Sequence, residues 1–250
     1  MSSRPPSGLE RLWRRGELDR EPRLGLSLER IVTSGIELAD AEGLGAVSMK
    51  RVAERLGFTT MSLYRYVTSK DDLLLLMHDT ASQPAPGFEV PTGDWRAGLT
   101  VWTRAQQLIT ERHPWLDEVR YIERAGTPSQ IAWMELGLRA FGDVPLSEFE
   151  KLAILLLLSG YVSNQARLAA TAVHGVQMGA FEHPEQAAEA FGELLQSVLD
   201  PEQYPALIRA VQGGAFAPRH DPVYLPFDFG LDLILDGVDA LMRRQGAGPA

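Results

Sequence analysis

A short segment, Ser48–Lys70, constrains the fold of this chain more than any other part of its sequence. Ser48 is a good N-cap, since its hydroxyl can accept a hydrogen bond from an early backbone N–H, and the apolar residues that follow share one helical face: Val52, Ala53 and Leu56. Gly57 suits the left-handed residue that ends a helix, and Thr59 or Thr60 can cap a second helix directly after it. The spacing predicts a helix-turn-helix.

The second of these helices has one apolar face and one mixed face. Leu63 and Val67 share the inner face, whereas Met61 and Arg65 point the opposite way at about 100° per residue. An arginine there can pair with guanine O6 and N7, and a methionine can contact a thymine methyl group. The segment therefore predicts a DNA-reading helix, with Tyr64 on its flank as either a base contact or a packed aromatic.

The charge pattern agrees with this interpretation. The segment carries five basic residues and one acidic residue, in a chain whose formal net charge is −9. Residues 1–80 contain 12 basic and 12 acidic side chains, so the whole negative excess lies beyond residue 80. Since phosphate attracts a basic tip and repels an acidic body, we expect the tip to face DNA and the body to face away.

A third helix is predicted to begin after Ser69, which opens the capping-box pattern Ser69-Lys70-Asp71-Asp72 before an apolar run. Lys70 then lies at a helix N-terminus, where free N–H groups and the positive end of the helix dipole favour an anion. Lys70 is therefore either a phosphate clamp or an ordinary surface lysine.

Residues 28–78 resemble the DNA-binding domain of the tetracycline-repressor (TetR) family, above all in the stretch ERIVTSGIELADAEGLGAVSMKRVAERLGFTTMSLYRYVTSKDDLL. The resemblance implies that Lys50 reaches a base or phosphate, that Ser62 and Tyr64 enter the major groove, and that Tyr66 and Lys70 contact the backbone. Tyr66 lies near the buried side, so packing is its alternative role. The residues expected to contact DNA are Ser48, Lys50, Thr60, Met61, Ser62, Tyr64, Arg65, Tyr66 and Lys70.

We expect an all-α fold with three parts: an N-terminal arm at 1–26, a three-helix helix-turn-helix domain at 27–80, and a larger helical domain for ligand binding and dimerisation at 81–250. The last part also resembles tetracycline-repressor-like C-terminal domains, most clearly in FDFGLDLILDGVDALMRR. The arm is rich in arginine and can either enter a minor groove or pack on the protein through Leu9, Leu12 and Trp13.

Beyond residue 80 the pattern is helical, with a helix from Trp95 and further helices near 115–124, 128–142, 147–173, 184–199 and 202–213. The chain has no cysteine, which excludes disulfides and thiolate metal sites. Its longest apolar run, Leu152–Leu158, falls far short of the roughly 20 residues of a membrane span. We therefore expect a cytoplasmic protein without a membrane helix.

Two helices carry more apolar surface than one chain can cover, namely the one after Pro145 and the last one. We expect them to pair with their copies in a four-helix homodimer interface, with purely internal packing as the alternative. The residues assigned to the interface are Leu156, Gly160, Ser163, Phe227, Gly230, Leu231, Ile234, Gly237, Val238 and Leu241.

The ligand is not identified by any motif. Aromatic and amide side chains of the C-terminal part are its candidate contacts, with core packing or interface hydrogen bonds as alternatives: Trp102, Gln106, Trp115, Tyr121, Trp133, Tyr161, Asn164, Gln165, His174 and Met178. We expect no cofactor and no metal, since His174, His183 and Glu182 lack ligand spacing.

The function that these features favour is a ligand-responsive repressor that binds a palindromic DNA operator as a homodimer and is released by an unknown small molecule. An enzyme is disfavoured, because the chain lacks G-x-S-x-G, G-x-G-x-x-G and P-loop motifs and the βαβ alternation of nucleotide-binding folds. The remaining alternative is a helical ligand-binding protein whose head does not engage DNA.

Overall fold

The computed structural model describes residues 12–13, 25–119, 126–177, 182–183, 186–217 and 227–246. This part of the chain forms α and 3-10 helices and no β-strand, as an all-α sequence predicts. It divides into two compact units, residues 1–162 with 242–250 and residues 163–241. Each unit is described by itself.

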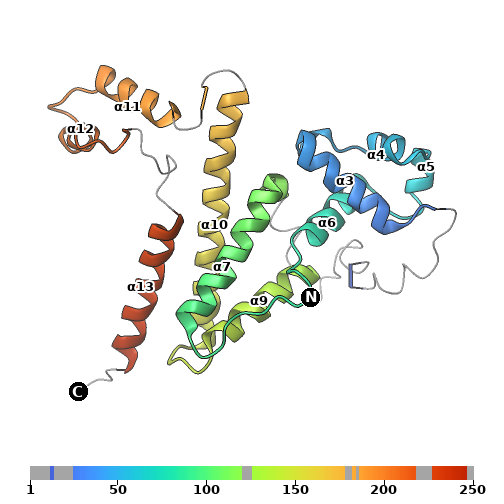
Figure 1. Ribbon diagram of the computed structural model, residues 1–250, viewed down its shortest axis with the longest axis horizontal. Helices are drawn as coiled ribbons and strands as arrows, with labels where there is room; N and C mark the ends of the chain where they lie inside the picture. Colours follow the sequence, from blue (N-terminus) through green and yellow to red (C-terminus); the bar gives the residue numbers. More distant parts are fainter. Residues whose placement is uncertain are drawn as a thin grey trace, which may run out of the picture. The chain divides into compact units, whose positions relative to one another are not determined.

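The first unit begins with a compact head made of α3 (Leu28–Glu42), the 3-10 helix η1 (Leu44–Ala46), α4 (Met49–Leu56), α5 (Thr60–Leu63) and α6 (Lys70–Ala81) (Figure 1). Helices α4 and α6 both pack on α3, and α5 packs on α4. Gly57 has a φ of 74° and its N–H donates to the last turn of α4, which is the left-handed helix end predicted from the sequence.

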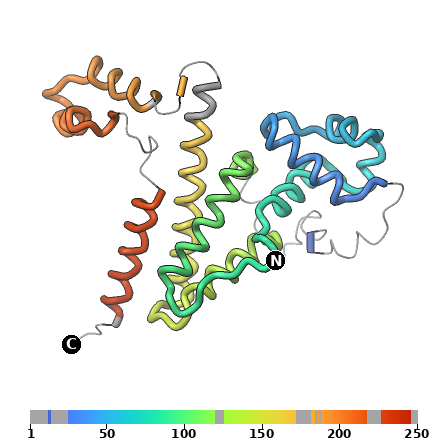
Figure 2. The backbone as a smooth tube through the Cα atoms, in the orientation of Figure 1, coloured from blue at the N-terminus to red at the C-terminus, as the bar shows by residue number. Residues whose placement is uncertain are grey.

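The rest of the first unit is built on α7 (Trp95–Arg112), the 3-10 helix η2 (Pro114–Glu118), α9 (Pro128–Phe141) and the start of α10 (Glu148–Gln177). Figure 2 follows the chain from the head through α6 into α7. The segment 115–124 was expected to be an α-helix; its described part is η2 and the extended residue Val119. The head core continues here, because it includes Trp115, Leu116 and Val119.

The N-terminal arm is described at residues 12–13 and 25–26, and Leu12 and Trp13 contact the rest of the first unit. Leu12 is buried in the head core, and the Trp13 indole N–H donates to the Gly126 carbonyl at 3.1 Å. This is the packing alternative predicted for the arm. Its arginines lie outside the described residues.

Helices α7 and α9 cross at Gly98, where they come unusually close. A Cβ on Gly98 would lie 2.7 Å from the Pro91 carbonyl oxygen and 3.0 Å from the Cβ of Ala140. Both neighbours are rigid, so a side chain here must push the two helices apart.

Gly98→Val is therefore expected to lower the free energy of unfolding by about 1–3 kcal/mol through overpacking. Urea unfolding followed by circular dichroism measures this loss. Gly45→Ala is the matched control, because no atom lies within 4 Å of the added Cβ. If Gly98→Val unfolds at the same denaturant concentration as Gly45→Ala, the close approach of α7 and α9 at Gly98 is contradicted.

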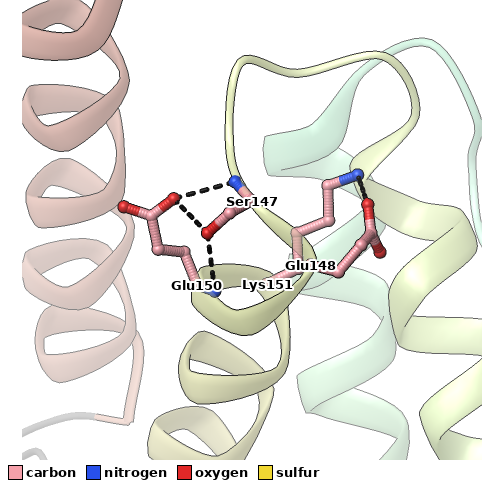
Figure 3. A network of polar contacts seen from close by, with 4 residues as sticks. All are labelled: Ser147, Glu148, Glu150 and Lys151. Atoms are coloured by element: carbon pink, nitrogen blue, oxygen red, sulfur yellow. Dashed lines mark hydrogen bonds and ion pairs between the residues drawn. The ribbon is translucent and has the colours of Figure 1, made fainter.

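The start of α10 is fixed by a capping box at Ser147 and Glu150 (Figure 3). The N–H and hydroxyl of Ser147 donate to Glu150 Oε2 at 2.8 and 2.7 Å, and the Glu150 N–H donates to Ser147 Oγ at 3.3 Å. Gln245, near the end of α13 (Phe227–Gly246), donates to Glu150 Oε1 at 2.5 Å. The hydrogen bonds from Ser147, then that from Gln245, lower the pKa of Glu150 below 4.5.

This pKa shift predicts a pH dependence of stability. A carboxylate whose folded pKa is lowered stabilises the fold above its unfolded pKa and loses that effect as pH falls through the folded value. Glu150→Ala should therefore lower the Tm at neutral pH, and the gap to the unsubstituted protein should close as the pH falls below about 4.5. A gap that stays constant on acidification contradicts the role of the ionised cap.

Helix α10 differs from one sequence expectation, which was that no helix could span a membrane. Its segment Glu148–Thr171 is long and apolar enough to do so by length and composition alone. Ile154, Leu155 and Leu158 are buried, whereas Leu156 and Leu157 are exposed. The apolar excess of α10 therefore lies on an exposed face as well as in the core.

The second unit contains α11 (Gln186–Val198) and α12 (Pro205–Gln212), which pack against each other, together with parts of α10 and α13. The rings of Phe191 and Phe216 meet edge to face at 5.5 Å, and Gly192 leaves room for Phe216. These helices match the ranges predicted from the sequence within a few residues.

Candidate nucleic-acid interface

The outer surface of α5 presents the side chains that the sequence assigns to base contact. Leu63 and Val67 are fully buried in the head core. Met61 is 75% exposed and Tyr64 is 44% exposed, while Arg65 is exposed beside them. The apolar side of this short helix is thus docked, and its mixed side is free to meet another surface.

The regular helix is shorter than the sequence pattern suggests, because it ends at Leu63 and continues as a hydrogen-bonded turn. In this turn the Tyr66 hydroxyl donates to the Leu26 carbonyl at 2.9 Å, and the ring packs against the head core. The Tyr66 hydroxyl thus anchors the turn to the segment before α3, which is the packing role left open by the sequence, and its contact with the DNA backbone stays a prediction.

Three smaller polar residues assigned to DNA contact are partly used inside the head. Ser48 caps α4 by accepting from the Arg51 N–H at 3.2 Å. Thr59, rather than Thr60, caps α5, and its hydroxyl also bonds the Ser62 hydroxyl at 2.9 Å. Thr60 and Ser62 are half-buried. These residues fix the turn and have little free surface.

The basic charge of the head is less available than its sequence indicates. Arg51 pairs with Glu42 at 2.7 Å and Arg55 pairs with Glu37 at 2.9 Å, both across to α3. The hydrogen bond from Arg51 lowers the pKa of Glu42. The Nζ of Lys50 lies 3.7 Å from the Oε1 of Glu54, four residues later on the same helix, and the Lys50 side chain is highly exposed. Two of the five basic side chains are thus committed to holding α4 on α3.

Arg65 and Lys70 form no ion pair with any other described residue and are exposed. Lys70 is the first residue of α6, whose cap Ser69 accepts from the Asp72 N–H at 3.0 Å. Asp72 in turn accepts from the N–H and hydroxyl of Thr68, the residue before the cap, both at 2.9 Å. The predicted cap therefore forms, and it holds Lys70 at the edge of the exposed α5 surface.

One assigned ligand contact, Trp115, instead joins the head to the rest of the first unit. Its indole N–H donates to Asp40 Oδ1 on α3 at 2.7 Å. His113 Nδ1 lies 2.7 Å from the same oxygen. Trp115 thus has a structural role in this unit, and its contact with a ligand stays a prediction. Asp40 was missed in the sequence because its partners lie more than 70 residues away.

Two further ligand candidates, Trp102 and Trp133, contact each other edge to face with ring centroids 6.2 Å apart. The Trp102 indole N–H donates to the Trp133 carbonyl at 2.8 Å, and the Trp133 indole N–H donates to the Ser82 carbonyl at 2.7 Å. Both rings are buried. Their N–H groups are used within the protein and are not free to orient a ligand.

Gln106 differs from these tryptophans. Its Oε1 accepts from Ser159 Oγ on α10 at 3.3 Å, whereas its Nε2 is buried without a hydrogen-bond partner in the described structure. A buried amide donor without an acceptor costs about 1–3 kcal/mol, so it favours an unseen partner. Among the described ligand candidates, Gln106 is the one with a buried polar atom that no described residue satisfies.

The other ligand candidates are more scattered. Tyr161 and Gln165 are half-buried, and Asn164 is exposed with its oxygen bonded to Arg167 at 3.1 Å. Tyr121, Met178 and the side chain of His174 lie outside the described residues. In the part of the chain that the structure describes, no group of three or more His, Cys, Asp or Glu side chains is arranged to hold a metal.

The residues assigned to the dimer interface separate into three groups. Leu156, Gly160 and Gly237 are exposed, whereas Leu231 and Val238 are already buried within one chain and are removed from the assignment. Intermediate exposure is found for Ser163, Phe227, Gly230, Ile234 and Leu241. The exposed apolar side chains of α13 that the sequence assignment missed are Phe229 and Leu233.

Comparison with known families identifies this arrangement. Residues 31–77 match the family described as bacterial regulatory proteins, tetR family, and residues 85–242 match the tetracyclin repressor-like C-terminal domain. The chain belongs to the TetR family. It is therefore a helix-turn-helix transcriptional regulator with a tetracyclin repressor-like C-terminal domain, and α4 with α5 is the helix-turn-helix of this TetR-family protein.

Individual TetR-family relatives cover most of the chain. The HTH-type transcriptional repressor DrrR1 of Streptomyces coeruleorubidus is 34% identical over 239 residues, which cover 95% of this chain and 86% of that protein. The tetracycline repressor protein class E of Escherichia coli is 29% identical over 146 residues, which cover 54% of this chain and 65% of that protein. The crystal structure of Streptomyces coelicolor ActR with (S)-DNPA matches with a TM-score of 0.67 at 25% identity. The match covers 87% of this chain and 98% of the ActR chain.

Proposed function

We propose that this TetR-family protein binds a palindromic operator as a homodimer and leaves it when a small molecule binds its C-terminal domain. The observation that carries the operator contact is the exposed surface of α5 and the turn after it, where Met61, Tyr64 and Arg65 face outward while Leu63 and Val67 are fully buried. Arg65 would pair with a guanine, Met61 and Tyr64 would contact neighbouring base edges, and Lys70 would hold a phosphate.

The proposed dimer interface uses the exposed apolar side chains of α10 and α13. On α10, Phe149, Leu152 and Leu156 are exposed at helical spacings of three and four residues. On α13, Phe229 and Leu233 are exposed four residues apart. Apolar stripes of this kind mark protein interfaces, and a two-fold axis would bring each stripe against its copy. This places two heads on one operator.

The proposed effector site includes Gln106, whose buried Nε2 has no partner in the described structure. The complex of ActR with (S)-DNPA supports a small organic ligand as the effector class. Such a ligand can release the operator only if it binds more tightly to the protein conformation that does not bind DNA. This difference in binding free energy is typically about 1–3 kcal/mol. We place the protein in the cytoplasm, where its operator DNA lies.

Selection of bound fragments from random DNA tests the operator proposal. We expect an inverted repeat whose half-sites are about one helical turn, roughly 34–36 Å, or somewhat more apart. The affinity for this sequence should fall steeply as salt rises, because the head releases counterions from phosphate. Recovery of fragments without a common sequence, bound equally well, would contradict a sequence-reading head.

A further inference from the structure

Met61 is the most exposed methionine in the part of the chain that the structure describes. It is 75% exposed, compared with 37% for Met134 on α9. The other described methionines are buried: Met49, Met77 and Met242. The sequence has no cysteine, so the sulfur atoms of the chain are those of its methionines. An oxidant in solution therefore reaches the Met61 sulfur more readily than any other sulfur of the described residues.

The position of Met61 in the helix-turn-helix gives this sulfur a consequence for DNA reading. Met61 is the second residue of α5, and the N-terminal residues of a recognition helix are those that contact base edges. A thioether is apolar and polarisable, so it suits contact with a thymine methyl group. Met61 thus combines a base contact in the proposed operator complex with an accessible sulfur in the free protein.

Oxidation changes the side chain at its point of contact. A sulfur lone pair attacks the terminal oxygen of a hydroperoxide, and the S–O bond forms as the O–O bond breaks. The departing oxygen takes up the proton and leaves as water or an alcohol, so the sulfur loses two electrons and the peroxide gains them. The product, methionine sulfoxide, carries a strongly polar oxygen where the side chain was apolar. A thiol-dependent methionine sulfoxide reductase reverses the step, with release of water and a disulfide.

The hydroxyls nearest to Met61 in the sequence are already engaged with each other. Thr59 Oγ1 accepts from the Ser62 N–H at 3.3 Å and bonds the Ser62 hydroxyl at 2.9 Å. Arg65, four residues after Met61, is exposed and forms no ion pair with any other described residue. Its guanidinium is a donor available to a sulfoxide oxygen, and such a bond withdraws the arginine from a guanine contact. Oxidation of Met61 therefore affects both base readers.

We propose that Met61 is a modification site for hydroperoxides and that its sulfoxide weakens operator binding, which makes the reading surface sensitive to oxidants. This inference rests on the proposed function and adds a regulation that acts at the reading surface itself. Operator DNA and the oxidant compete for the same side chain. Met61 is therefore oxidised more slowly in the operator complex than in the free protein.

Mass spectrometry of tryptic peptides tests the modification in the full-length protein treated with hydrogen peroxide. Residues 56–65 form a peptide in which Met61 is the only methionine, and residues 125–139 form one in which Met134 is the only methionine. In the free protein we expect Met61 sulfoxide to form at least about twofold faster than Met134 sulfoxide, in line with their exposures. Bound operator should slow only the Met61 reaction. Equal rates for the two methionines in the free protein overturn the proposal.

Operator affinity before and after peroxide treatment tests the consequence. It should fall at least about 5-fold, because the sulfoxide places a polar group without a hydrogen-bond partner against an apolar base edge. Each variant is compared with its own untreated form: Met61→Leu should keep its affinity after peroxide, whereas Met134→Leu should lose it as the unsubstituted protein does. A loss that persists in Met61→Leu, or no loss in the unsubstituted protein, overturns the proposal. Absence of a selected operator before peroxide is added refutes the proposed function instead, and the oxidation rates still decide whether Met61 is the modification site.

Discussion

Arg65→Ala is expected to lower the affinity for the preferred operator about 5- to 150-fold and to remove discrimination at one base position of each half-site. Arg65 is exposed beside Met61 and Tyr64 and has no ion pair with a described residue. A well-formed arginine contact to guanine contributes about 1–3 kcal/mol of discrimination. Binding measured against the operator and its single-base variants gives both quantities.

Lys70→Ala provides the contrast, because it removes a phosphate contact that carries no sequence information. It should weaken binding to all sequences to a similar extent and flatten the dependence of log affinity on log salt by about one unit. If Arg65→Ala and Lys70→Ala both weaken every sequence equally, the division into base reader and phosphate clamp is wrong.

The features of the head that were predictable from sequence are local ones. The caps at Ser48 and Ser69 form, and Gly57 ends α4 in the left-handed conformation. Each depends on residues within about four positions of one another, and over this distance the helix geometry determines which groups can come into contact. The inner face of Leu63 and Val67 follows from the same short-range periodicity.

The contacts that could not be predicted from sequence are those in which a side chain meets a partner distant in the chain. Tyr66 was expected on the DNA backbone, but its hydroxyl meets Leu26, 40 residues earlier. Trp115 was expected at a ligand, but Asp40 accepts its indole N–H. An aromatic residue with a polar tip satisfies either role, and only the tertiary fold decides which acceptor lies within reach. Tyr66 and Trp115 therefore could not be assigned from periodicity.

The last helix shows a second limit of sequence pattern. Its apolar residues form more than one stripe along the helix. A spacing of three and four residues therefore selects buried residues such as Leu231 and Val238 as readily as exposed ones. The structure buries these two and exposes Phe229 and Leu233. Periodicity finds an apolar face, whereas the packing of one chain determines which face is left for another.

The exposed stripes of α10 and α13 lead to the second large prediction, the double substitution Leu156→Asp with Leu233→Asp. These side chains are 62% and 56% exposed, so the single chain should fold with little change in stability. In a dimer they would place unpaired carboxylates in an apolar interface, which is strongly unfavourable. We expect a monomer by sedimentation at micromolar concentration, where we expect the unsubstituted chain to be a dimer.

Loss of the dimer should reduce operator affinity at least about 100-fold, because two linked heads bind one palindrome with a high effective concentration. Leu108→Asp is the matched control: Leu108 is 65% exposed on α7, a helix that contributes to neither stripe. It should leave the dimer and the operator affinity unchanged. If the unsubstituted protein sediments as a monomer, or the double variant as a dimer, then α10 and α13 do not form the interface, and spacing between two heads cannot be the quantity that an effector changes.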